Sequence, residues 1–181
     1  MASERVLHSL AAIVLVVGLW LSHQVDPRVR VDRLFLNGRI ATIKFTPRLA
    51  GPHPNVLMAH GVGASKETLF RLGEALAASG LTCYAIDLPG HGGSSFRFRA
   101  HDNAETLREA AQEIGSIDVF VGHSMGAYAG ADAIYRHYMA PRLLIALGAL
   151  PSTKAPLLVL VGRWDEAVPA GHLPPQHLIV S

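Results

Sequence analysis

A serine between small residues is the part of this sequence best suited to do chemistry. It lies in the pentapeptide Gly122-His123-Ser124-Met125-Gly126. Residues 118–121 before it form a short apolar run that predicts a buried strand, and residues 127–138 after it predict a helix. Glycines on both sides let the chain turn so sharply that the serine hydroxyl stands at the tip of the turn. The hydroxyl is then placed to act as a nucleophile; the alternative is a glycine-rich turn without a chemical role.

Strand-like and helix-like segments alternate around this turn. The Asn37-Gly38 pair predicts a tight turn between the first two strands, because both residues tolerate a positive φ. Ser65 and Gly80 are placed to begin and end the first helix. Strands are expected over 34–36, 40–45, 55–59, 81–86, 118–121, 142–146, 156–161 and 177–180, and helices over 66–79, from about 102 to 115, and over 127–138. This alternation favours an α/β fold with a mostly parallel sheet flanked by helices on both faces.

Two more motifs follow predicted strands upstream of the serine. His60-Gly61-Val62-Gly63 follows one strand, and Asp87-Leu88-Pro89-Gly90-His91-Gly92 follows the next. A later strand, 157–161, leads to Asp165. In this order and spacing the motifs resemble those of the α/β-hydrolase family, and the resemblance extends from about Leu34 to the end of the chain. The resemblance implies an α/β-hydrolase sheet and a serine hydrolase related to esterases and lipases.

The same resemblance assigns roles to four residues. Ser124 would be the nucleophile, and Asp165 would orient the base and stabilise its cationic form. The backbone N–H groups of Val62 and Met125 would stabilise the negative charge that develops on the carbonyl oxygen. A backbone donor does not depend on its side chain, so a valine at position 62 is compatible with this role. For Asp165 the alternative is a solvated loop aspartate. No cofactor and no metal are implied.

The sequence does not assign the histidine base to one residue. In the family the base follows the acid, and the histidines after Asp165 are His172 and His177. His172 lies in a loop rich in glycine and proline and is a candidate base. His177 begins the last predicted strand, whereas the family's base lies on the loop after that strand. Because the sequence ends at Ser181, we expect the catalytic histidine to be missing from this chain, through truncation rather than because the protein is a pseudoenzyme, and we expect this fragment by itself to be inactive.

The composition fits one globular domain without a nucleic-acid partner. Half of the 181 residues are hydrophobic and 17% are charged, which argues against disorder. The net charge is +2 and no long basic run occurs. The single cysteine, Cys83, is expected to be a small buried hydrophobe. We expect His60, His91 and His123 to shape the loops of their motifs rather than to act as bases.

The segment 1–25 is predicted to be a unit separate from the hydrolase domain, which covers 29–181. Leu10 to Leu21 is an unbroken apolar run, and counting back to Val6 gives 16 residues. A spanning helix needs roughly 17–25. Because no small-residue cleavage site follows, an apolar helix that anchors the protein in a membrane is favoured over a signal that is cleaved before secretion. A buried core helix is disfavoured because the run has no polar face. Arginines on both sides of the run leave the membrane orientation open.

Two classes of function fit these expectations. The first is a serine hydrolase that cleaves a small-molecule ester, or less favourably an amide, through an acyl-serine intermediate. The second is a non-catalytic, membrane-tethered α/β domain that binds a small apolar ligand or a partner. Only residues 147–155 join the strand after the serine-bearing helix to the strand before Asp165. Such a short connection predicts an open site without a lid domain.

Overall fold

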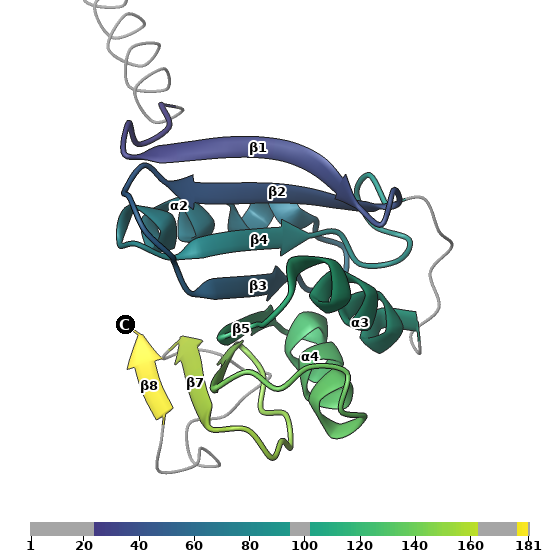
Figure 1. The fold of residues 1–181 in the computed structure, drawn as a ribbon. Coiled ribbons are helices and arrows are strands. Elements are labelled where there is room, and N and C mark those ends of the chain that lie inside the picture. The colour runs from purple at the N-terminus through teal and green to yellow at the C-terminus, as the bar shows by residue number, and fades with distance from the viewer. Residues whose placement is uncertain (1–23, 95–101, 163–176, 181) are drawn as a thin grey trace, which may run out of the picture.

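Eight strands form one sheet within residues 24–94, 102–162 and 177–180, the residues that this computed structural model describes (Figure 1). The strands are β1 (Val29–Leu36), β2 (Ile40–Pro47), β3 (Asn55–Ala59), β4 (Thr82–Ile86), β5 (Val119–His123), β6 (Leu143–Leu147), β7 (Leu157–Gly162) and β8 (His177–Val180). They lie in the order β1-β2-β4-β3-β5-β6-β7-β8. β2 is antiparallel to both of its neighbours, and every other pair is parallel. The mostly parallel sheet predicted from the alternation is therefore confirmed.

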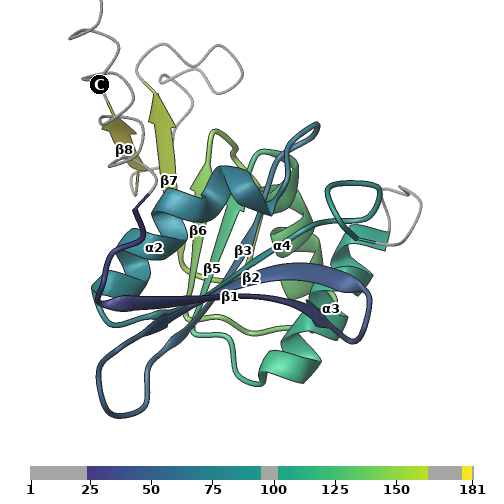
Figure 2. The ribbon, with the colours of Figure 1, turned by 90° about the horizontal axis from the view of Figure 1, so that it is seen from above.

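Helices cover both faces of the sheet (Figure 2). The helices are the 3-10 helix η1 (Lys66–Leu69) and the α-helices α2 (Phe70–Ala78), α3 (Asp102–Ile114) and α4 (Met125–Tyr135). Successive side chains of a strand point to opposite faces. In β3, Leu57 and Ala59 pack in one apolar cluster with α3 and α4, whereas Val56 and Met58 pack in the other with α2. β3 is thus buried on both faces, which explains why its sequence is a continuous apolar run.

The tight turns of the sequence occur where they are expected. Asn37 and Gly38 have φ values of 49° and 66° between β1 and β2, and Gly80 has a φ of 97° after α2. Cys83 is fully buried in β4, and burial raises the pKa of its thiol to about 12. The predicted helix over 127–138 is wrong at its end, because α4 stops at Tyr135 and His137 has a φ of 60°.

The start of the helical segment after β3 differs from the prediction. The sequence predicts Ser65 as the residue that caps this helix, but its side chain makes no capping hydrogen bond. The Lys66 N–H instead donates to the Asp87 carboxylate at 2.7 Å. The first turn is a 3-10 helix, and the α-helix begins only at Phe70. A cap supplied by a residue so distant in the sequence leaves no local sequence pattern.

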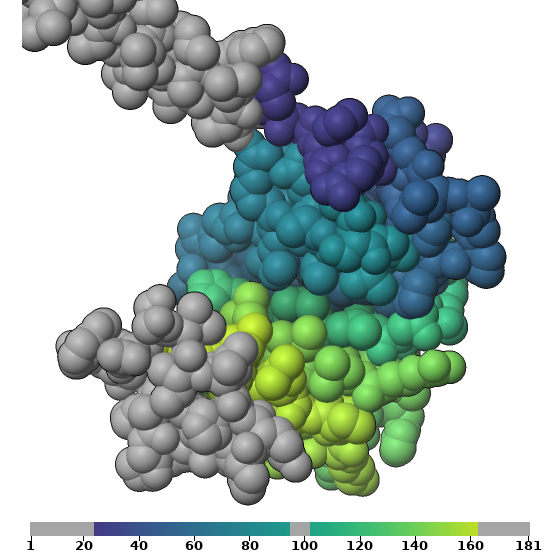
Figure 3. Space-filling model, turned by 90° about the vertical axis from the view of Figure 1, so that its left-hand side faces the viewer, coloured from purple at the N-terminus to yellow at the C-terminus, as the bar shows by residue number. Residues whose placement is uncertain are grey.

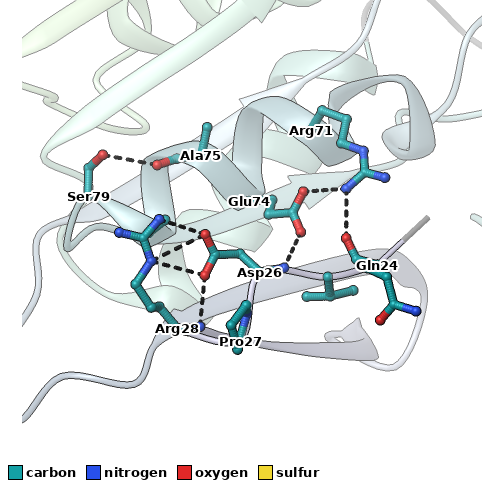
Figure 4. Close-up of a pocket in the computed structure, with 10 residues that line it drawn as sticks. Gln24, Asp26, Pro27, Arg28, Arg71, Glu74, Ala75 and Ser79 are labelled. Atoms are coloured by element: carbon teal, nitrogen blue, oxygen red, sulfur yellow. Dashed lines mark hydrogen bonds and ion pairs between the residues drawn. The ribbon is translucent and has the colours of Figure 1, made fainter. Parts of the chain in front are cut away.

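The described chain begins against the outer side of α2 (Figures 3 and 4). The Asp26 N–H donates to the buried Glu74 carboxylate at 2.6 Å, and Arg71 donates to the Gln24 carbonyl at 3.2 Å. The Arg28 guanidinium lowers the pKa of Asp26 to about 2. A hollow of about 490 Å³ lies between this segment and α2. Residues 24–28 are therefore bound to the domain by specific contacts.

The predicted apolar helix lies almost entirely in residues 1–23, outside the described part of the chain. Within the described part, none of the helices has both the length and the apolar character needed to span a membrane. The division into an anchor over 1–25 and a hydrolase domain over 29–181 stays a prediction.

Candidate active site

Ser124 lies at the turn between β5 and α4, with its backbone at φ 48° and ψ −114°. A residue other than glycine rarely adopts such a φ, and the strain is of order 1–3 kcal/mol. Two backbone hydrogen bonds of 2.9 Å hold the turn. The Ser124 N–H donates to the Leu147 carbonyl, and the Ala127 N–H donates to the Ser124 carbonyl. The strain therefore persists because neighbouring elements of the fold fix both sides of the serine.

The two glycines of the pentapeptide are required by close backbone contacts. A Cβ on Gly122 would lie 2.4 Å from the Ala127 nitrogen and Cα. A Cβ on Gly126 would lie 2.4 Å from the Ala59 carbonyl oxygen at the end of β3. Because these obstacles are backbone atoms, no rotation of a side chain can relieve them. The expectation that small residues let the chain turn sharply is confirmed.

The loop after β3 lies directly against Ser124. A Cβ on Gly61 would be 3.3 Å from the Ser124 Cβ and 2.8 Å from the Nδ1 of His123. Val62, the next residue, has 71% of its surface exposed. Met125 is the first residue of α4, and the first N–H groups of a helix have no partner within the helix. The two segments predicted to supply oxyanion donors thus meet at the serine.

His60 is a structural residue rather than a base. It is completely buried. Its Nε2 accepts the Leu88 N–H at 3.0 Å, so the proton is on Nδ1, which lies 2.8 Å from the Gly61 carbonyl and donates to it. Burial lowers the pKa of His60, which keeps the ring neutral. Both ring nitrogens are occupied, in agreement with the expectation that this residue shapes its loop.

Asp87, directly after β4, accepts hydrogen bonds from three groups although it is completely buried. The donors are the Lys66 N–H at 2.7 Å, the Lys66 ammonium at 2.6 Å and the Gly93 N–H at 2.7 Å. Gly92 has a φ of 53°, and a Cβ there would lie 2.0 Å from the carboxylate. The glycine-rich segment after β4 is therefore wrapped around a buried carboxylate.

His91 also joins the two loops. Its Nε2 accepts the Gly63 N–H at 3.3 Å, and its Nδ1 lies 2.9 Å from the Pro89 carbonyl. Its ring centroid is 5.0 Å from that of His60. His91 therefore shapes the loop, as the sequence predicts.

The structure does not describe two of the predicted site residues. Asp165 and His172 lie within 163–176, outside the described residues, and their roles stay predictions. His177 is the first residue of β8 and pairs with Val159 of β7. β7 is parallel to β5 through β6 and ends at Gly162, so the chain leaves it at the same edge of the sheet as Ser124.

Lys66 and Asp87 are the residues of this region to which the sequence analysis assigned no role. The sequence does indicate a role for Asp87, because a polar residue directly after a buried parallel strand lies at the edge of the sheet where functional sites form. The sequence gives no such indication for Lys66, because its bond to Asp87 depends on how two loops meet. Among the residues of 24–94, 102–162 and 177–180, no three His, Cys, Asp or Glu side chains gather as metal ligands.

Comparison with known proteins agrees with this geometry. The profile of the Alpha/beta hydrolase family matches residues 56–179, from β3 to β8. The chain belongs to this family. Membership supports a hydrolase activity in general, and the matched residues include the Ser124 turn and both loops described above.

Solved structures with the same fold include proteins described as hydrolases. A protein from Thermus thermophilus is 23% identical, with a TM-score of 0.65 over 84% of this chain and 89% of its own. A membrane phospholipase A, described as a bacterial virulence factor, is 16% identical, with a TM-score of 0.66 over 98% of this chain and 88% of its own. An esterase of M. tuberculosis is 24% identical, with a TM-score of 0.58 over 76% of this chain. This chain spans 46% of that esterase's length, and these identities show a shared fold.

Proposed function

We propose that the protein is a serine hydrolase that cleaves a small-molecule ester at Ser124 through an acyl-serine intermediate. The observation that carries the proposal is the strained Ser124 turn, packed against the His60–Gly63 loop. Strain of this kind clusters at functional sites, because a fold retains it only where surrounding contacts impose it. An esterase and a phospholipase, both named for ester cleavage, are among the proteins that share the fold.

The proposed reaction has two steps. In the first, the Ser124 Oγ attacks the carbonyl carbon while a base takes the hydroxyl proton, and the N–H groups of Val62 and Met125 stabilise the oxyanion. The tetrahedral intermediate then expels the alcohol, which receives the proton from the base. In the second step, water attacks the acyl-serine in the same way and releases the acid. Amide cleavage by the same route is the less favoured form of the proposal.

For the base we propose the order found in the family, with Asp165 as the orienting acid and the histidine after it. His172 is the candidate that the sequence places in a loop, and His177 belongs to β8. Gly162, at the end of β7, shortly precedes Asp165 in the sequence and lies at the Ser124 edge of the sheet. This placement supports Asp165 as a neighbour of the serine.

Labelling with a fluorophosphonate tests the proposal directly. The reagent phosphonylates a serine whose hydroxyl is activated, with loss of fluoride, and leaves ordinary serines unmodified. We expect one adduct on the full-length gene product, mapped by mass spectrometry to the peptide that contains Ser124. Loss of the adduct in either His172→Ala or His177→Ala would identify the base.

The control for this labelling is Ser79→Ala, which removes an exposed hydroxyl at the end of α2 and should label like the wild type. If the folded full-length gene product is not labelled, or is labelled elsewhere than Ser124, the serine hydrolase proposal is rejected. The non-catalytic α/β domain that binds an apolar ligand would then be the better description.

We also propose that residues 1–25 anchor the protein in a membrane, on the basis of the apolar run from Leu10 to Leu21. Membranes washed with alkaline carbonate should retain the full chain in the pellet, because an inserted helix resists this wash. A chain that starts at Gln24 should be recovered in the supernatant.

The chain starting at Gln24 is a matched control, because it keeps the contacts of Asp26 and Gln24 with α2. Any difference in partition then comes from the segment 1–23. Recovery of the full chain at its full mass in the supernatant would contradict an anchor. If the protein is recovered in the supernatant with a mass smaller by that of the amino-terminal segment, a cleaved signal would be favoured.

A further inference from the structure

The loop beside Ser124 and the loop after β4 are joined by hydrogen bonds at three points. The first, residues 60–66, carries Gly61 and Val62; the second, residues 87–94, follows β4. The Leu88 N–H donates to His60 at the start of the first loop, and the Gly63 N–H donates to His91 near its middle. At its end, Lys66 donates to Asp87 with both its N–H and its ammonium group.

The contact of Lys66 with Asp87 is the one charged link among these bonds. Asp87 is completely buried, and the Lys66 side chain is only 12% exposed. The ammonium lies 2.6 Å from the carboxylate. Because the Asp87 side chain has no exposed surface, water would not solvate its charge if the ammonium were removed. Removing one partner of a buried ion pair leaves an uncompensated charge, which is strongly destabilising. The second loop also depends on this carboxylate, because Gly93 donates to it.

Lys66 lies where the first loop ends and the helix η1 begins. Lys66 is the last residue of the first loop and the first of η1, so its bonds to Asp87 determine where the loop ends. Val62 lies four residues earlier in the same loop, and a Cβ on Gly61 would lie 3.3 Å from the Ser124 Cβ. A shift of the loop end would therefore move the Val62 N–H relative to the serine. Misplacement of a donor by about 1 Å is enough to lower a rate by roughly 10²-fold.

We propose that Lys66 is a positioning residue for the hydrolase reaction, which, through its ion pair with buried Asp87, holds the Val62 N–H where the oxyanion forms. The inference rests on the proposed function. Lys66 does not touch the substrate in this scheme; it acts through the loop. Its effect should therefore appear in the transition state and not in the binding of the ester.

The test compares three variants of the full-length gene product with the wild type. Lys66→Met keeps the length of the side chain and removes its charge, Lys66→Arg restores a cation, and Arg33→Met removes a cation from the exposed ion pair with Glu67 on the same short helix. For p-nitrophenyl acetate, we expect Lys66→Met to lower kcat by about 10- to 100-fold with KM within twofold, since removing an oxyanion donor altogether costs about 10²–10³. Lys66→Arg should recover most of kcat, and Arg33→Met should match the wild type.

Amide hydrogen exchange supplies a second measurement that does not depend on turnover. Lys66→Met should exchange faster than the wild type, by tenfold or more, in peptides that cover 60–66 and not in those that cover α4. If Lys66→Met does not fold, Lys66→Gln takes its place, because its amide can still donate to Asp87. Lys66→Gln should then show the same lowering of kcat and the same faster exchange over 60–66, each smaller than expected for Lys66→Met.

The outcomes separate this inference from the proposed function. Turnover by the wild type that does not depend on Ser124, or no turnover at all, defeats the proposed function and the inference with it. Ser124-dependent turnover together with an unchanged kcat in Lys66→Met defeats the inference alone. A reduced kcat with unchanged exchange over 60–66, or an equal reduction in Arg33→Met, also defeats it.

Discussion

Replacing Ser124 with alanine should lower the hydrolysis of p-nitrophenyl acetate by at least ~10³-fold. The hydroxyl is the group at the tip of the turn that would form the acyl intermediate, and alanine removes it with little other change. Alanine meets the same constraint as serine at a φ of 48°. The turnover of the purified full-length gene product, measured alongside its melting temperature, checks the prediction.

The melting temperature separates loss of chemistry from loss of fold. Ser124→Ala should melt within a few degrees of the wild type, because the two backbone hydrogen bonds that hold the turn involve no side-chain atom. Hydrolysis by Ser124→Ala at a rate near that of the wild type would remove Ser124 from the role of nucleophile. A large fall in melting temperature would mean that the hydroxyl is needed for the turn itself.

Most of the sheet could be predicted from sequence because its inner strands are short and apolar and lie between turn residues. β3 is the clearest case: residues 55–59 are predicted and observed with the same bounds, since the four residues after Asn55 are buried on both faces and all apolar. The first strand is predicted less completely. β1 begins at Val29, whereas only 34–36 are predicted, because 29–33 carry Arg30, Asp32 and Arg33 on a strand at the sheet edge.

The Ser124 turn could be predicted because its constraint is local. Gly122 and Gly126 must lack a Cβ so that β5, α4 and β3 can approach one another, and both glycines lie in one short stretch of sequence. The contact between Gly61 and Ser124 is not local, yet the resemblance to a family places it correctly, since the order of the motifs implies their proximity.

The ion pair of Lys66 with Asp87 could not be predicted in this way. A lysine just after small residues at a helix start usually indicates a solvated side chain. Its burial becomes visible only when the loop after β4 is folded over it, with Gly92 and Gly93 closing around the carboxylate. The wrong cap assignment at Ser65 has the same cause: a distant carboxylate supplies what a local side chain was expected to supply.

Gly126→Ala should damage both stability and activity. The added Cβ would lie 2.4 Å from the Ala59 carbonyl oxygen and 2.8 Å from that of His60, both backbone atoms at the end of β3. Overpacking of this kind costs about 1–3 kcal/mol or more. For a chain of this size, that lowers the melting temperature by roughly 2–12 °C. Because α4 must move away from β3, the Ser124 turn and the Gly61 loop separate, and turnover should fall by about 10- to 100-fold.

Gly162→Ala is the matched control for this substitution. A Cβ on Gly162, at the end of β7, meets no atom of the described residues within 4 Å, so the variant should melt within about 2 °C of the wild type. Thermal unfolding and p-nitrophenyl acetate hydrolysis of both variants provide the comparison. If Gly126→Ala is as stable and as active as Gly162→Ala, β3 and α4 do not pack as closely as described, and the Ser124 turn is not held by that contact. If Gly126→Ala loses activity while keeping its melting temperature, the contact serves the geometry of the site more than the stability of the fold.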